Sequence, residues 1–210
     1  MSVSASQHWL ERLRARRAQA RTQLCSPLAW MALRTSARES ILADVEKWLE
    51  YAAFPSPPEG AVPIIAAYIA ESRAFRTLLY YRLRHSRSVV VKLAMPLLGA
   101  IWRPHPTLIL HPDSLGPGCF ILHGDSTMVG ARSIGRNFVV GQHVVVGYRG
   151  AGELPTIGDN VSIYAGAIVL GAITIGDGAT IGAGAVVTSN VPRGATVVPM
   201  PARPVPVAPR

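Results

Sequence analysis

The chain has 210 residues, of which 49% are hydrophobic and 16% charged, so it can form one large or two small domains with a sizeable core. Its two cysteines exclude a disulfide framework and favour a reducing, cytoplasmic location. No run reaches the roughly 20 apolar residues of a spanning helix, and the first residues lack the apolar core of a signal peptide. The formal net charge of +9, carried almost entirely by arginine, favours anionic partners such as nucleic acid, a membrane surface or a phosphorylated ligand.

Helical patterns fill the first part of the chain, and we expect a helical region over residues 1–104. The first helix, over Ser6–Arg21, has arginines around most of its surface, yet no Gly-rich or aromatic-interleaved pattern supports nucleic-acid binding. Ser36 is the expected N-cap of the next helix, which should run from Ala37 to Phe54. Two further helices are expected over Pro63–Ser72 and Ala74–His85.

A nearly uncharged stretch, Ser88–Trp102, ends the helical region. Its only charged residue is Lys92, and it is too short to span a bilayer. We interpret it as a packed helix that caps the β region after it, because an uncovered coil end exposes unpaired strand groups. Interfacial contact with a membrane is the minor alternative for the same stretch.

From Ile157 to Pro192 an aliphatic residue recurs every six positions, a period that fits neither an amphipathic helix nor a hairpin sheet. The repeated residues are Ile157, Ile163, Val169, Ile175, Ile181 and Val187. Six-residue repeats are typical of a left-handed parallel β-helix, in which three repeats close one coil. The stacked pairs should therefore be Ile157 with Ile175, Ile163 with Ile181, and Val169 with Val187.

We place this β-helix over residues 105–192. Weaker six-residue spacing precedes the main run, and an irregular patch, HGDSTMVGA, interrupts it. Val146 and Ile157 stand eleven positions apart rather than six, so the extra residues within Gly147–Thr156 should project as a loop. The proline-rich tail over residues 193–210 cannot continue a ladder of strands and should run extended.

Four pieces of sequence carry a resemblance to a known family: GPGCFILHG, IGRNFVVGQHVVVG, the run from Pro155 to Pro192, and PAR at 201–203. On these pieces the chain from Gly116 to Arg203 resembles the serine acetyltransferase branch of the hexapeptide-repeat acyltransferases. His123, in its GPG-x4-H context, and Gln142 limit the resemblance to this branch of the superfamily. The segment Ala74–His85 also resembles the last helices before the β-helix in the shorter members.

The resemblance implies an acetyl-CoA-dependent O-acetyltransferase that acts on a small hydroxyl acceptor, serine or a serine-like metabolite. His123 aligns with the family's catalytic histidine, which takes the acceptor proton. Histidine suits this role because its unperturbed pKa lies near neutrality. Asp125 or a backbone carbonyl is then expected to orient this imidazole, and Gln142, His143 and Arg149 to line the acceptor pocket.

The donor site follows from the same resemblance, in which coenzyme A lies in a groove between two β-helices of a homotrimer. The pantetheine arm then pairs with the backbone at Ala165 and Ala183 and at the start of the loop, Gly147 and Tyr148. Arg203 is expected to meet a coenzyme A phosphate. We expect acetyl-CoA as co-substrate, no metal, and trimers that can pair into a dimer of trimers through the helical region.

Several positions depart from the pattern of the serine acetyltransferases. Ile109 stands where the family has the acid that orients the catalytic histidine, and Leu122 where longer members have an acid beside that histidine. Glu153 and Leu154 replace an Arg-His pair that meets the serine carboxylate. Because these departures remove serine-reading contacts, acetylation of a sugar, a polysaccharide or a specialised metabolite is the alternative.

Two other protein classes share the expected architecture. A γ-type carbonic anhydrase needs three histidines around zinc, including a closely spaced pair on one coil, and the histidines here do not supply that arrangement. A non-catalytic β-helix that serves as a scaffold or binding module stays open as the third hypothesis. Release of free thiol from acetyl-CoA with a panel of hydroxyl acceptors separates it from the enzyme.

Overall fold

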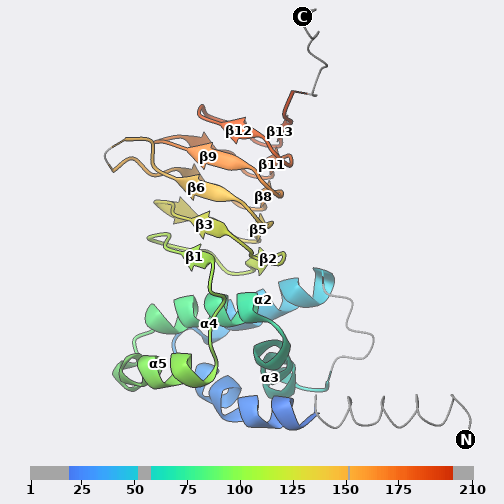
Figure 1. Ribbon diagram of the computed structural model, residues 1–210, viewed down its shortest axis with the longest axis vertical. Helices are drawn as coiled ribbons and strands as arrows, with labels where there is room; N and C mark the ends of the chain where they lie inside the picture. Colours follow the sequence, from blue (N-terminus) through green and yellow to red (C-terminus); the bar gives the residue numbers. More distant parts are fainter. Residues whose placement is uncertain (1–18, 52–57, 151, 201–210) are drawn as a thin grey trace, which may run out of the picture.

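The computed structural model of the protein describes residues 19–51, 58–150 and 152–200. A helical region forms one end of the molecule, and a parallel β-helix of about five coils rises from it (Figure 1). The expected fold class, a helical region followed by a β-helix of hexapeptide repeats, is confirmed. None of the helices within the described ranges is long and apolar enough to cross a bilayer.

The helical region contains a helical stretch over residues 19–32 and then α2 (Arg38–Tyr51), α3 (Ala61–Glu71), α4 (Arg73–Arg84) and α5 (Val89–Ile101). The last three match the helices predicted from the sequence. Most of the basic helix predicted over Ser6–Arg21 lies outside the described residues, as does the predicted helix end at Phe54.

The expected N-cap of α2 is wrong. The Ala37 N–H donates to Thr35 Oγ1 at 3.2 Å, so the hydroxyl that satisfies the start of the helix comes from Thr35. Ser36 Oγ instead accepts a hydrogen bond from the Arg87 N–H at 3.0 Å. Ser36 therefore links the beginning of α2 to the turn that precedes α5.

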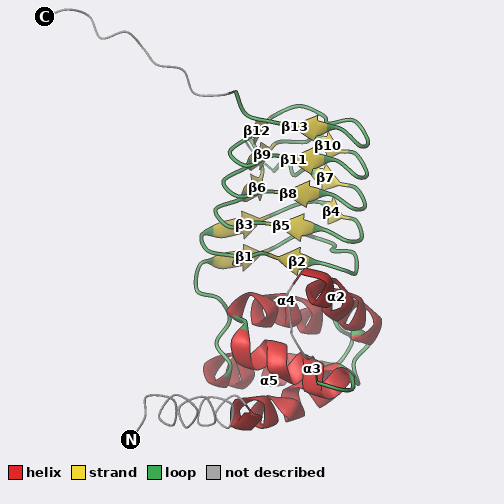
Figure 2. Ribbon diagram, turned by 90° about the vertical axis from the view of Figure 1, so that its right-hand side faces the viewer, coloured by secondary structure: helices red, strands yellow, loops and turns green. Residues whose placement is uncertain are grey.

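The strands of the β-helix form three parallel sheets along the faces of a prism (Figure 2). The first sheet has the order β1 (Leu108–Leu110), β3 (Thr127–Val129), β6 (Val145–Gly147), β9 (Ile168–Leu170) and β12 (Val186–Val187). The second consists of β4 (Ser133–Ile134), β7 (Thr156–Ile157) and β10 (Thr174–Ile175). The third has the order β2 (Phe120–Ile121), β5 (Val139–Val140), β8 (Ser162–Ile163), β11 (Thr180–Ile181) and β13 (Thr196–Val197).

The six-residue repeat builds internal ladders of aliphatic side chains. The predicted stacked pairs, Ile157 with Ile175, Ile163 with Ile181 and Val169 with Val187, are all confirmed by the strand register. All six side chains are buried. Each contributes about 1.5–3 kcal/mol relative to an exposed position, so the ladders account for much of the stability of the β-helix.

The β-helix continues past residue 192, so the prediction that the tail leaves the ladder there is wrong for its first residues. Strand β13 pairs with β11, and the Thr180 N–H donates to the Ala195 carbonyl oxygen at 2.9 Å. Pro192 causes no break because it lies in the turn before β13, where its carbonyl oxygen accepts from the Ala195 N–H at 3.2 Å. A proline ends a ladder only where its missing N–H is needed.

The open end of the first coil is covered by α2 and α4, so the expectation that Ser88–Trp102 caps the β-helix is wrong. Helix α5 packs on α4 instead, with Val91 buried. The Tyr80 hydroxyl of α4 donates to the carbonyl oxygens of Leu98 and Trp102 at 2.9 and 2.8 Å, and burial raises the pKa of this phenol to about 12. A strand edge needs polar partners, which α2 and α4 supply and the apolar α5 lacks.

A buried ion pair joins the helices to the first coil. The Asp44 carboxylate of α2 accepts two hydrogen bonds from Arg82 of α4, one from Nε at 2.8 Å and one from Nη2 at 2.9 Å. The same carboxylate accepts from the N–H groups of Gly118 and Cys119 at 2.9 and 2.8 Å. The guanidinium also donates to the Gly116 carbonyl oxygen at 2.7 Å. Both charges are thus hydrogen-bonded on several sides, the condition under which a buried pair is tolerated.

Trp48 lies one helical turn after Asp44 and makes the second contact of this joint. Its Nε1–H donates to the Cys119 carbonyl oxygen at 3.0 Å, and its ring meets Phe75 and Phe120 edge-on, with centroids 5.2 and 5.0 Å apart. Burial raises the pKa of the Cys119 thiol, so this cysteine stays protonated and serves packing.

Replacing Arg82 with methionine should lower the free energy of unfolding by about 3–5 kcal/mol, because the Asp44 carboxylate is left buried without its cation. Arg84→Met, on the exposed side of the same helix, is the matched control and should cost less than about 0.5 kcal/mol. Urea unfolding followed by circular dichroism measures both. Equal losses in the two variants would show that the pair does not hold the joint.

Candidate active site

His123 lies at an enlarged corner of the β-helix. Six residues, 122–127, lie between Ile121 and Met128, whereas only four, 141–144, lie between their partners Val140 and Val145 in the next coil. His123 and Ser126 have left-handed backbones with φ of 67° and 46°, a conformation that residues other than glycine rarely adopt and that concentrates at functional sites. His123 is exposed, and its ring makes no hydrogen bond within the described chain, so both ring nitrogens are accessible.

The same corner repeats in the coils above and brings predicted residues into one column. The His143 N–H donates to the Asp125 carbonyl oxygen at 2.8 Å, and the Gly184 N–H to that of Ala165 at 2.9 Å. Gly166 and Gly184, each with a φ of 72°, keep the upper corners tight. From the first coil upward, the predicted site residues of this column are His123, Asp125, Gln142, His143, Ala165 and Ala183.

His105, just before β1, braces the corner. Its Nε2 lies 3.3 Å from Oδ1 of Asp125. The Thr107 N–H donates to Nδ1 of His105, so Nε2 carries the proton that faces the carboxylate when the ring is neutral. Thr107 Oγ1 also accepts from the Ser126 N–H at 3.0 Å, and the His105 N–H donates to Thr77 Oγ1 of α4 at 2.9 Å. The Asp125 carboxylate therefore contacts His105 rather than His123, and the corner is tied to α4.

The other predicted residues lie at the start of the loop between β6 and β7, which projects from a different edge of the prism (Figure 1). Gly147 ends β6, and its carbonyl oxygen accepts from the Gly171 N–H at 3.0 Å. Tyr148 and Arg149 follow and are exposed. Within one chain these residues lie apart from the His123 column. The corner that carries His123 precedes a strand of the first sheet, β3, whereas the loop follows a strand of the same sheet, β6, so the two lie at opposite ends of these strands.

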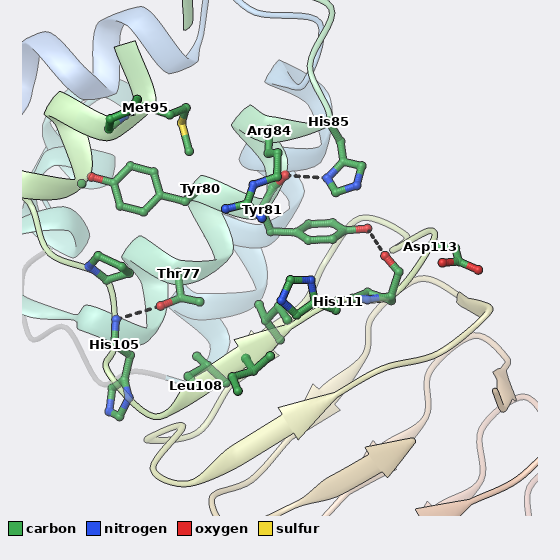
Figure 3. A pocket seen from close by; sticks show the side chains of 16 residues that line it. Thr77, Tyr80, Tyr81, Arg84, His85, Met95, His105, Leu108, His111 and Asp113 are labelled. Atoms are coloured by element: carbon green, nitrogen blue, oxygen red, sulfur yellow. Dashed lines mark hydrogen bonds between the residues drawn. The ribbon is translucent and has the colours of Figure 1, made fainter. Parts of the chain in front are cut away.

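A groove of about 770 Å³ lies between α4, α5 and β1 (Figure 3). Its lining includes three histidines, His85, His105 and His111, while none of the predicted site residues contributes to it. The Tyr81 hydroxyl, also in the lining, donates to the Pro112 carbonyl oxygen at 3.1 Å. His105 connects the groove with the corner, since it lines one and pairs with Asp125 of the other.

Comparison with known proteins agrees with this architecture. The family model "Bacterial transferase hexapeptide (six repeats)" matches residues 155–189. A serine acetyltransferase of Staphylococcus xylosus is 34% identical over 143 residues, which make up 66% of this chain and 65% of that protein. Serine acetyltransferase of Neisseria gonorrhoeae, solved in complex with serine, has a TM-score of 0.60 at 29% identity and covers 83% of this chain and 72% of that one. The soybean apoenzyme has a TM-score of 0.52 at 30% identity, with 80% and 68% covered.

The chain belongs to the serine acetyltransferase-like branch of the hexapeptide-repeat acyltransferases. It spans 65% of the length of the Staphylococcus xylosus protein, slightly less than two thirds. Membership therefore establishes the fold and the family. The reaction, the acceptor and the assembly of this chain have to be argued from its own residues.

The positions at which this chain departs from the family pattern lie near the His123 corner and in the loop between β6 and β7. Ile109 on β1 and Leu122 beside His123 are both exposed apolar side chains. Glu153 is exposed, and the Leu154 side chain lies against Gly130. Each departure thus leaves an apolar or acidic surface where the resemblance predicts a contact for the histidine or the acceptor.

One residue of this site, His105, has no signal in the sequence. It stands twenty positions before Asp125 and follows no repeat, so only the folded segment before β1 brings the two together. Arg203, the expected phosphate contact, lies outside the described residues. Among the described residues no three His, Cys, Asp or Glu side chains are grouped to hold a metal ion.

His105 and His85 should show opposite neutral tautomers. His85 Nδ1 lies 2.8 Å from the Tyr81 carbonyl oxygen, which can only accept, so its proton is on Nδ1, whereas that of His105 is on Nε2. Long-range ¹H–¹⁵N spectra at a pH where both rings are neutral measure this. Asp125→Asn should perturb the His105 signals and leave those of His85 unchanged. The same tautomer at both residues would contradict the assigned brace.

Proposed function

We propose that the chain is an acetyl-CoA-dependent O-acetyltransferase that transfers an acetyl group to a hydroxyl of a small acceptor, serine or a serine-like metabolite. The observation that carries the proposal is an exposed, unpaired His123 on a strained corner, at the foot of the column that leads to Ala165 and Ala183. Membership of the serine acetyltransferase-like branch supports the same reaction.

His123 acts as the general base. Its imidazole takes the proton of the acceptor hydroxyl while that oxygen forms a bond to the acetyl carbonyl carbon. The carbon–sulfur bond to coenzyme A then breaks, and the imidazolium returns the proton to the departing thiolate. A positioned general base contributes about 10²–10⁴-fold to such a step.

Asp125 and His105 hold the corner that carries this base. The role expected for Asp125, direct orientation of His123, is replaced in our proposal by an indirect one. Its carboxylate pairs with His105, and the Ser126 N–H bonds to Thr107, so both ends of the turn after His123 are fixed. This arrangement compensates for Ile109, which cannot orient an imidazole.

The donor binds along the column above His123. Its pantetheine arm meets backbone groups at Ala165 and Ala183, where small side chains permit close approach. Gly147 and Tyr148 lie on another edge of the same prism. A neighbouring chain that packs against the column would bring its own Gly147 and Tyr148 to the donor.

We therefore infer a homotrimer with shared sites, in which Arg203 meets a coenzyme A phosphate. Trimers that pair through the helical region are part of the same proposal.

Gln142, His143 and Arg149 contact the acceptor in this scheme. Burial of an ammonium or a carboxylate without a partner is expensive, and the apolar Leu122 and Leu154 offer no such partner. This observation favours a second candidate, a sugar, polysaccharide or specialised metabolite whose hydroxyl groups need only neutral hydrogen bonds. A scaffold without catalysis is less well supported because it does not require an unpaired histidine on a strained corner.

His123→Ala should lower turnover by about 10²–10⁴-fold while acetyl-CoA still binds, since only the base is removed. His111→Ala, an exposed histidine in the groove outside the column, is the matched control and should keep wild-type turnover. Thiol release gives the rate and calorimetry the binding. Near-normal turnover of His123→Ala would assign the base to another residue, with His143 the next to test.

The acceptor is best identified by competing L-serine, L-homoserine and sugars in one acetyl-CoA assay. We expect O-acetylation of at least one of them, with kcat/KM for L-serine below the efficient-enzyme range that begins at about 10⁴ M⁻¹s⁻¹. The reason is the loss of charged partners at Leu122 and Leu154. A value for L-serine within that range would refute this interpretation of the two leucines.

A further inference from the structure

Helix α5 exposes one whole face of apolar side chains. Val89, Val90, Leu93, Leu97 and Ile101 are between 58% and 78% exposed. Their spacing along the helix places them on a single stripe, opposite the buried Val91. An isolated exposed leucine is ordinary, but a contiguous apolar stripe along one helix face marks an interaction site.

The packing of α5 keeps this stripe directed outward. Tyr80 holds the end of the helix through hydrogen bonds to the carbonyl oxygens of Leu98 and Trp102. The opposite side of the helix meets α4 and the groove, where Met95 and Pro96 contribute to the lining. Rotation of the stripe into the core would break these contacts, so its exposure is part of the fold.

The surroundings of the stripe are cationic. No aspartate or glutamate occurs between Glu71 and Asp113 in the sequence. The exposed charged residues within α5 or within two positions of its ends are Arg87, Lys92 and Arg103. An apolar helix face bordered by cations matches an anionic lipid surface, where acyl chains receive the apolar side chains and head groups pair with the cations.

We propose that α5 docks the protein on the surface of an anionic membrane. With 13 residues it is about 20 Å long, too short to cross a bilayer, so it lies in the plane of the interface. A second copy of the chain fits the same face less well, because a two-fold contact would bring the cations of the two copies together. The docked helix would hold the first coil, with His123, near the lipid head groups, since the helical region adjoins that coil (Figure 1).

The test is flotation of the full-length protein with vesicles. Wild type should float with vesicles of phosphatidylglycerol mixed with phosphatidylcholine, bind pure phosphatidylcholine far less, and lose binding as salt is raised. The double variant Leu93→Glu/Leu97→Glu should lose more than about tenfold in affinity, because it places charge within the stripe. Val186→Glu/Val198→Glu, which changes equally exposed residues on the last coil, is the matched control and should bind as wild type.

Two further readouts separate the alternatives. Lys92→Glu/Arg103→Glu leaves the apolar stripe intact and should also weaken binding to the anionic vesicles, which an unfolding artefact at Leu93 and Leu97 would not explain. Light scattering without lipid should give the same particle mass for all variants. No flotation of wild type, or unchanged flotation of Leu93→Glu/Leu97→Glu, would overturn the proposal. A smaller particle for that variant without lipid would assign the stripe to a second copy instead.

Discussion

The joint between Asp44 and Arg82 is the constraint on which the rest of the structure depends. A β-helix needs a closed first coil, because its outermost strand groups would otherwise lose their hydrogen bonds. Arg82 donates to the carbonyl oxygens of Leu115 and Gly116, and Asp44 accepts from two N–H groups that follow them. The two side chains thus act as one polar cap, which an apolar helix could not provide.

The candidate site lies where the regular repeat is interrupted, next to this joint. The hexads supply a stiff prism of buried aliphatic ladders, and such a repeat alone offers no reactive group. Extra residues at the corner from β2 to β3 push His123 outward, while His105 and Thr107 tie the same corner to α4. The rigid column thus provides a binding surface, and the irregular first corner positions the base beside it. Functional sites are where departures from a regular sequence pattern are expected.

The sequence predicted those elements that arise from a regular spacing of apolar residues. Ile157 stacks on Ile175 because three uninterrupted six-residue repeats separate them, and the helices α3 to α5 lie over the segments predicted to be helical. It could not predict contacts between distant positions: Asp44 and Arg82 are 38 residues apart, and no pattern links His105 to Asp125. The nearly uncharged stretch Ser88–Trp102 forms α5 but does not cap the β-helix, because hydrophobicity indicates a preference for leaving water and not which surface the helix packs against.

The central claim is that the donor lies along the corner column that ends at His123. Hydrogen–deuterium exchange of the full-length protein, with and without saturating coenzyme A, tests it most directly. The account predicts slower exchange in peptides that contain residues 141–148, 164–166 and 182–184, with α5 and the groove unaffected. Protection confined to α4, α5 and residues 104–113 would place the donor in the groove and contradict the account.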